Sequence, residues 1–200
     1  MKIVFATENK GKIKEINEIL SDFDAEIVPM SEAGINIEID ENGSTYEENA
    51  LIKATAVMKE SGCLTLADDS GLEVDYIKGE LGIHSARFMG HDTSYDIKNA
   101  EILRRLEGVP DEERTARFVC TIAAAFPDGR TEVVRATFEG IIAKEISGAN
   151  GFGFDPIFFL PDRGCTSAEI TPEEKNEISH RGKALRMMRD RLIELGVFDK

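Results

Sequence analysis

Two apolar runs joined by a turn decide the fold: ARFVCTIAAAF (Ala116–Phe126), PDGR (Pro127–Arg130) and TEVVRATFEGIIA (Thr131–Ala143). Both runs are rich in the β-branched and aromatic residues that favour strands, and the Pro-Asp-Gly sequence between them is typical of a turn. The stretch therefore predicts a long antiparallel hairpin.

The N-terminal region predicts a different kind of pairing. Lys2–Ala6 and Ala25–Met30 are short apolar runs typical of buried strands, and Ile13, Ile16 and Ile19 between them have helical spacing, in a helix expected to end near Ser21-Asp22. A strand, a helix and a second strand favour parallel pairing, whereas the later hairpin pairs antiparallel. The sequence thus predicts an α/β fold with a long, mixed, twisted β-sheet flanked by helices.

Three further helical regions follow from caps and periodicity. Thr45 and Glu48 form a capping-box pattern before a helix expected to reach about Ser61. Apolar spacing predicts a second helix over 97–106. Thr171-Pro172 begins a third helix, and Ser179 is a further cap before a helical face that ends at Gly196. In the looser segment between these regions, Ser85–Phe88 is expected to be extended.

A short acidic segment, Ala67-Asp68-Asp69-Ser70-Gly71, lies between the apolar run Leu64–Leu66 and the alternating run Leu72–Tyr76. This pattern predicts a strand, a tight acidic turn and a second strand. Adjacent carboxylates at a strand end are often only solvated, but they also suit Mg²⁺, which prefers oxygen ligands and commonly binds one or two carboxylates. The segment by itself leaves both readings open.

Composition narrows the class of partner. The chain has 200 residues with a formal net charge of −14, which argues against binding to nucleic acid or to anionic membranes. No run approaches the roughly 20 apolar residues of a membrane span, and the N-terminal run is too short for a signal peptide. Three cysteines, widely spaced, suggest neither a zinc site nor a disulfide framework, so we expect a reducing, cytoplasmic location.

Two segments near the N-terminus are candidates for phosphate or metal binding. Thr7-x-Asn9-x-x-Lys12 joins a strand to a helix, where backbone N–H groups and the helix dipole favour an anion. It is not a Walker A loop, and a plain helix cap is an equal alternative. Glu48 opens the next helix and Lys53 follows it; capping alone would also explain Glu48.

Two later segments are candidates for binding a base. Gly151-Phe152-Gly153-Phe154-Asp155 permits close backbone approach and offers aromatic faces, although a sheet bend with both phenylalanines in the core is the alternative. Lys175, His180 and Arg181 gather at helix starts, where positive charge opposes the dipole. Their charge requires an anion or nearby acids, for which Glu173, Glu174 and Glu177 are candidates.

Six motifs in order carry a resemblance to a known family: Thr7-Glu8-Asn9-Lys10-Gly11-Lys12, Glu48-Asn49-Ala50, Ala67-Asp68-Asp69-Ser70-Gly71, Ser85-Ala86-Arg87, Gly151-Phe152-Gly153-Phe154-Asp155-Pro156 and Ser179-His180-Arg181-Gly182. Together they resemble the inosine triphosphate pyrophosphatase family, whose members hydrolyse non-standard purine nucleoside triphosphates. The likeness spans Ile3 to Leu195. One departure is Phe154, where the family often has Tyr, so one polar contact is absent.

The resemblance implies a single domain over 1–200 with two lobes and a central cleft, a homodimer, and Mg²⁺-dependent hydrolysis of ITP, dITP or XTP to monophosphate and pyrophosphate. It implies Asp69 as proton acceptor and metal ligand, with Glu48 and Asp68 in or near the metal shell. It also implies these substrate contacts: Thr7, Glu8, Asn9, Lys10, Gly11, Lys12, Lys53, Ser70, Phe152, Gly153, Phe154, Asp155, Lys175, His180 and Arg181. His180 and Arg181 are the expected readers of the 6-oxo edge of the base.

Two alternatives remain open from the sequence. One is a nucleotide-binding sensor without turnover, which would not need Asp68-Asp69 beside a metal. The other is a pyrophosphatase for modified pyrimidine triphosphates. A substrate panel with product identification separates all three hypotheses.

Overall fold

The computed structural model describes residues 1–20 and 25–197. The chain divides into two compact units: Met1–Asp69, Cys120–Ala136 and Arg181–Lys200 form the first, and Ser70–Val119 and Thr137–His180 form the second. The expected end of the first helix near Ser21-Asp22 lies outside the described residues. Each unit is considered by itself below.

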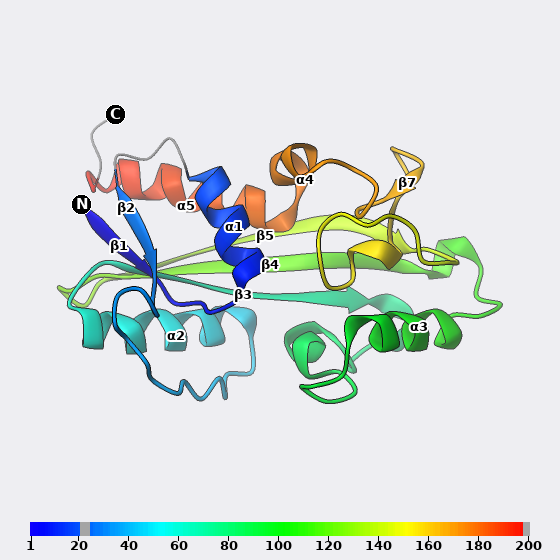
Figure 1. Cartoon of the computed structure of the whole chain (residues 1–200), viewed down its shortest axis with the longest axis horizontal. Coiled ribbons are helices and arrows are strands. Elements are labelled where there is room, and N and C mark those ends of the chain that lie inside the picture. Colours follow the sequence, from blue (N-terminus) through cyan, green and yellow to red (C-terminus); the bar gives the residue numbers. More distant parts are fainter. Residues whose placement is uncertain (21–24, 198–200) are drawn as a thin grey trace. The chain divides into compact units, whose positions relative to one another are not determined.

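The elements follow the order drawn in Figure 1. The strands are β1 (Lys2–Phe5), β2 (Glu26–Pro29), β3 (Thr65–Val74), β4 (Thr115–Ala125), β5 (Thr131–Ile142), β6 (Phe158–Leu160) and β7 (Cys165–Thr166). The helices are α1 (Lys10–Ile19), α2 (Tyr46–Ser61), α3 (Tyr95–Arg105), α4 (Pro172–Ile178) and α5 (His180–Glu194). Short 3₁₀ helices cover Asp75–Ile77, Gly82–Arg87, Asp111–Glu113 and Asp155–Ile157.

The sheet is mixed, which confirms the predicted fold class. Its seven strands have the order β2-β1-β3-β4-β5-β6-β7. β1 pairs in parallel with β2 and β3, whereas β6 pairs antiparallel with β5 and β7. The predicted hairpin joins β4 to β5: Phe126 N–H donates to Arg130 O at 2.9 Å, and Gly129 takes a φ of 91° in the turn.

In the first unit, helices cover both faces of the sheet (Figure 1). On one face α1 and α5 bury a cluster that includes Ile16, Leu185 and Met188 against β1, β3 and β4. On the other face α2 buries Ala50, Ala54 and Val57. Strand side chains alternate between the two clusters, as a pleated strand requires, so consecutive residues of β3 face different helices.

The second unit has its own core, with Leu72, Ile102, Phe118 and Phe158 among its buried members. The predicted helix over 97–106 is confirmed as α3, in which Ile97 is exposed and Lys98 and Asn99 are buried.

Two local predictions were wrong. Asp68-Asp69 is not a turn, because β3 runs without a break from Thr65 to Val74. Gly71, within the strand, admits a neighbouring segment, because a Cβ there would lie 2.1 Å from Gly82 O. That segment, Gly82–Arg87, is a 3₁₀ helix and not extended, and the buried Ser85 hydroxyl fixes it by donating to Gly82 O at 2.6 Å and accepting from Leu72 N–H at 2.9 Å.

The predicted caps at Thr45 and Thr171 are present. Thr45 Oγ1 accepts from Glu48 N–H at 3.1 Å at the start of α2. Thr171 and Glu174 form a complete capping box at α4, with Pro172 as the first helical residue. Ser179 has extended backbone between α4 and α5. Over 1–20 and 25–197, no helix is both long and apolar enough to cross a membrane.

Candidate functional site

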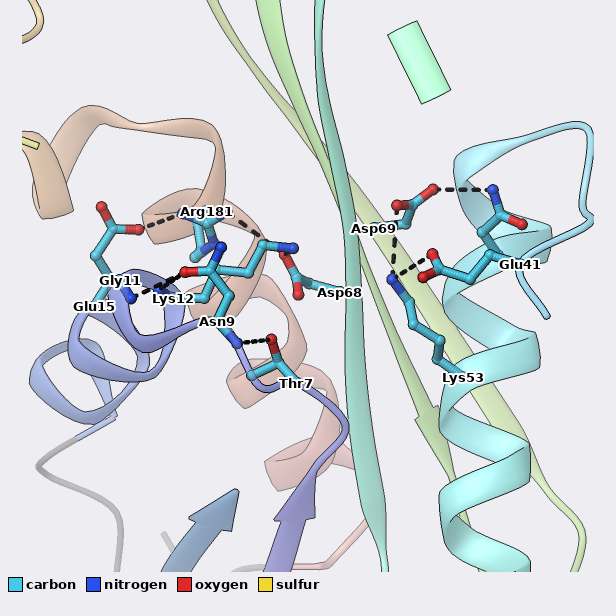
Figure 2. A network of polar contacts seen from close by, with 11 residues as sticks. Thr7, Asn9, Gly11, Lys12, Glu15, Glu41, Lys53, Asp68, Asp69 and Arg181 are labelled. Carbon is cyan, nitrogen blue, oxygen red and sulfur yellow. Dashed lines mark hydrogen bonds and ion pairs between the residues drawn. The ribbon is translucent and has the colours of Figure 1, made fainter. Parts of the chain in front are cut away.

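Asp68 and Asp69 point to opposite faces of β3 in the first unit (Figure 2). This follows from the period of two in a strand, which sends neighbouring side chains to opposite sides. Asp68 points toward α1 and α5, and Asp69 points toward α2. The two carboxylates therefore belong to separate clusters, and the pair is not one bidentate ligand.

The Asp68 carboxylate is buried between two cations. Lys12 Nζ lies 2.8 Å from Asp68 Oδ2, and Arg181 Nη2 lies 3.5 Å from the same oxygen. Burial opposes ionisation of Asp68, but the charges of Lys12, Arg181 and Lys53 outweigh it and hold the pKa of this carboxyl well below its usual range. Asp68 is thus a permanent anion within a compensated ion network.

Arg181 is the second cation of that network, and its side chain is only 3% exposed. Its guanidinium also pairs with Glu15 of α1. Burial lowers its pKa, but Asp68 and Glu15 outweigh that effect and raise it. Glu15 and Asp68 therefore compensate the positive charge of Arg181 at this helix start.

The predicted phosphate loop is organised by Asn9, which caps α1. Asn9 Oδ1 accepts from the backbone N–H groups of Gly11 at 2.9 Å and Lys12 at 3.2 Å, and Thr7 Oγ1 accepts from Asn9 N–H at 3.3 Å. These two helix donors are therefore already satisfied by the cap. Glu8 and Lys10 are exposed beside it. The loop offers an anion its exposed side chains more than its backbone.

On the other face of β3, Asp69 lies among polar groups of α2. Asn49 Nδ2 donates to Asp69 Oδ2 at 3.3 Å, and Lys53 Nζ lies 3.7 Å from Asp69 Oδ1. The same ammonium is 2.8 Å from Glu41 Oε2. Burial raises the pKa of Asp69 above its ordinary value, with Lys53 acting in the opposite direction and Glu41 in the same direction. This carboxylate is a stronger base than a solvated aspartate.

Lys53 is positively charged in this setting. Burial disfavours its charge, but Asp68, Asp69 and Glu41 outweigh burial and raise its pKa. Glu41 is a residue that the sequence reasoning missed. It lies in the irregular acidic stretch 31–44, and only folding brings it to Lys53.

Glu48 does not join either cluster by a hydrogen bond. Its carboxylate accepts from Ser44 N–H at 2.6 Å and from Ser44 Oγ at 2.8 Å, and these bonds lower its pKa. Capping therefore accounts for its observed contacts. In the part of the chain that the structure describes, no group of three or more His, Cys, Asp or Glu side chains has metal-binding geometry.

In the second unit, Asp155 ties together the predicted base-binding segment. Asp155 Oδ2 accepts from Phe152 N–H at 2.8 Å and from Lys175 Nζ at 2.7 Å, while Oδ1 accepts from Ser167 Oγ at 2.9 Å. Lys175 Nζ also lies 4.9 Å from the centroid of the Phe152 ring. The structure thus brings Phe152, Asp155 and Lys175 together and adds Ser167, which no motif indicated.

Phe154 and His180 are both buried. Phe154 is 5% exposed and belongs to the core, so the structure favours the core alternative for this ring. His180 stacks on Phe118 with centroids 4.8 Å apart and an interplanar angle of 11°. Ser70, half-buried on β3, follows Asp69 directly. Whether these three contact substrate remains a prediction.

The chain is similar to known proteins over nearly its full length. A family model described as "Ham1 family" matches residues 3–191. A dITP/XTP pyrophosphatase from Desulforamulus reducens is 48% identical over 186 residues, which cover 93% of this chain and 92% of the relative. One from Clostridium perfringens is 45% identical over 197 residues, covering 96% of this chain and 97% of the relative.

Solved structures give the same picture. A HAM1 protein from Coxiella burnetii has a TM-score of 0.87 and 39% identity, covering 97% of this chain and 99% of the other. A dITP/XTP pyrophosphatase from Mycobacterium abscessus has a TM-score of 0.75 and 40% identity, covering 94% and 98%. The similarity extends over nearly the full length of each protein.

Proposed function

This chain belongs to the Ham1 family, and on that premise we propose that it hydrolyses non-standard purine nucleoside triphosphates such as dITP, ITP and XTP to the monophosphate and pyrophosphate. The observation that carries the proposal is full-length similarity to dITP/XTP pyrophosphatases, in a chain whose Asp69 is a buried carboxylate of raised pKa. The enzyme is a hydrolase acting on a phosphoanhydride bond.

Asp69 is the proposed proton acceptor. A water oxygen forms a bond to the α-phosphorus, the bond from that phosphorus to the bridging oxygen breaks, and pyrophosphate leaves. The water proton passes to the Asp69 carboxylate. The raised pKa of Asp69 favours this transfer, since general-base catalysis improves as the pKa of the base approaches the operating pH. Asn49 orients the carboxylate through its hydrogen bond to Oδ2.

Mg²⁺ is the proposed cofactor, and the Asp69 face of β3 has the oxygen donors to suit it. Asp69 and Glu41 are carboxylates that already share one cation, the Lys53 ammonium. Two carboxylates match the usual demand of Mg²⁺, which completes its shell with waters and substrate phosphates. When bound, the ion would neutralise triphosphate charge and acidify a water. Asp68 points away from this face, and Glu48 is engaged by Ser44.

The remaining clusters supply binding. We assign the triphosphate to Lys12, Lys53 and the exposed side chains of the Thr7–Lys12 loop. We assign the base to Phe152 and Lys175, which Asp155 holds in place. The Asp155 carboxylate accepts hydrogen bonds from Phe152, Lys175 and Ser167. Its proposed role is to position Phe152 and Lys175. A homodimer in the cytoplasm is the proposed state of the protein.

The test is a panel of dITP, XTP, dGTP, dATP and a modified pyrimidine triphosphate, with and without Mg²⁺, in an assay free of other pyrophosphatases. We expect monophosphate and pyrophosphate from dITP and XTP. Release of inorganic phosphate, or binding without turnover, would overturn the proposal. Analytical ultracentrifugation tests the dimer.

A further inference from the structure

The second unit contains an aromatic side chain that none of the motifs includes. Tyr95, the first residue of α3, packs edge-on against Phe154, with centroids 5.0 Å apart and an interplanar angle of 84°. Its ring also adjoins the backbone of the base segment: a Cβ on Gly153 would lie 3.5 Å from Tyr95 Cε1. Tyr95 is 39% exposed, whereas Phe154 is 5% exposed. Of these two touching rings, Tyr95 is the one that a ligand can reach.

The first turns of α3 hold this arrangement in place. Asn99, which is 2% exposed, donates from Nδ2 to Gly153 O at 3.1 Å. Lys98, which is 1% exposed, donates from Nζ to Ala86 O at 2.7 Å, and its ammonium lies 5.1 Å from the centroid of the Tyr95 ring. The start of α3 therefore fixes both the backbone at Gly153 and the Tyr95 ring beside it.

A ring held in this way is suited to binding a planar base. Aromatic side chains stack on bases because every base presents a π-face, and a ring whose rotamer is already fixed loses little entropy on binding. Burial raises the pKa of the Tyr95 hydroxyl, so this group stays protonated at neutral pH and keeps a hydrogen-bond donor at the edge of the ring.

We infer that Tyr95 contacts the nucleobase of the substrate and, with Phe152, forms the aromatic part of the base site, while Phe154 supports it from the core. This inference rests on the proposed function for the identity of the ligand, a purine nucleoside triphosphate. It assigns recognition to a residue of α3, outside the Gly151–Asp155 motif.

The kinetic test compares Tyr95→Ala, Tyr95→Phe and Tyr76→Ala in pyrophosphate release from dITP. Tyr76 is a matched control, because it is also exposed in the second unit but belongs to the 3₁₀ helix Asp75–Ile77 and not to α3. We expect Tyr95→Ala to raise KM about tenfold with kcat within about twofold, from the loss of one stacking contact. Tyr95→Phe and Tyr76→Ala should stay within about twofold of the parent in KM. An unchanged KM in Tyr95→Ala would overturn the inference.

A binding measurement separates contact from indirect effects. The chain has no tryptophan and three tyrosines, so tyrosine emission is visible. With metal chelated, we expect dITP to quench emission less in Tyr95→Phe than in Tyr76→Phe, and inorganic tripolyphosphate, which lacks a base, to bind Tyr95→Ala and the parent with equal affinity. Equal dITP quenching in the two Phe variants would overturn the inference. This titration needs no turnover, so it decides the role of Tyr95 even if the parent releases no pyrophosphate.

Discussion

Asp68 and Asp69 are neighbours in β3, but the two faces of the strand give their carboxylates opposite environments. On the α1–α5 face, Lys12 and Arg181 compensate Asp68 and hold its pKa low. On the α2 face, Asp69 receives one amide hydrogen bond and a more distant ammonium, and burial holds its pKa high. The first carboxylate stabilises the fold, and the second is kept in a state that favours accepting a proton.

The difference shows how adjacent residues of one type can take separate roles. An ion network with matched charges fixes α1 and α5 to the strand, which supports the loop that precedes α1. On the α2 face, the charge of Asp69 is only partly compensated. A carboxylate in such a setting usually lowers stability and is often found at a functional site. Replacing each carboxylate by an amide, in Asp68→Asn and Asp69→Asn, tests this difference between the two faces.

The largest expected effect is on turnover in Asp69→Asn. Loss of the proton acceptor should lower kcat for dITP by about 10²–10⁴-fold, with near-native circular dichroism. Asp128→Asn in the hairpin turn is the control and should retain parental turnover. A kcat within about threefold of the parent would remove Asp69 from the mechanism.

The next effect is on stability in Asp68→Asn. This change leaves Lys12 and Arg181 without their shared carboxylate, and breaking a buried ion pair costs about 3–5 kcal/mol in the free energy of unfolding. Urea denaturation measures the loss. Glu18→Gln, in the exposed Lys14–Glu18 pair, should change stability by less than about 0.5 kcal/mol. Equal losses in the two variants would contradict the contrast between the faces.

With metal chelated, Asp68 and Asp69 should contribute to the pH dependence of stability with opposite signs. Because the folded pKa of Asp68 lies below its unfolded value of about 3.9, its stabilisation is complete above that value and is lost as pH falls toward the folded pKa. The folded pKa of Asp69 lies above its unfolded value. The charged Asp69 carboxylate therefore destabilises the protein fully at pH values above the folded pKa, and this destabilisation is relieved as pH falls through the folded pKa.

Relative to the parent, Asp68→Asn should therefore keep its full deficit above about pH 4 and begin to lose it below that value, and Asp69→Asn should be more stable at pH 7 with a gain that shrinks on acidification. Urea midpoints from pH 3 to pH 8 measure both. A gain in Asp68→Asn at pH 7, or a deficit in Asp69→Asn, would show that the faces have been assigned the wrong way round.

The smallest effect is expected from Asn9→Ala, which tests how the loop beside the Asp68 face is held. Loss of the cap should cost about 1 kcal/mol of stability, because Gly11 and Lys12 N–H groups lose their acceptor. Asn9→Ser keeps a capping oxygen and should recover most of the loss. Thermal denaturation measures both variants, and no difference between them would show that the cap does not organise the loop.

Much of the fold could be predicted from local pattern. The hairpin at Pro127–Arg130 and the caps at Thr45 and Thr171 depend on residues close in sequence, and the structure confirms them. The acidic segment at Asp68 was misjudged as a turn, because two adjacent charges in a strand are tolerated only when other elements supply their partners. Those partners, from α1, α2 and α5, are distant in sequence.

The sequence by itself determined the mixed sheet, the helices, and the identity of the acids, lysines and aromatics that could bind a nucleotide, since periodicity and composition are local properties. Tertiary structure alone decided which of them meet. It placed Lys12 and Arg181 at Asp68 and Glu41 and Lys53 at Asp69, and so set the two pKa values in opposite directions. A pKa depends on burial and on charges within a few ångströms, and these arise only when distant segments pack together.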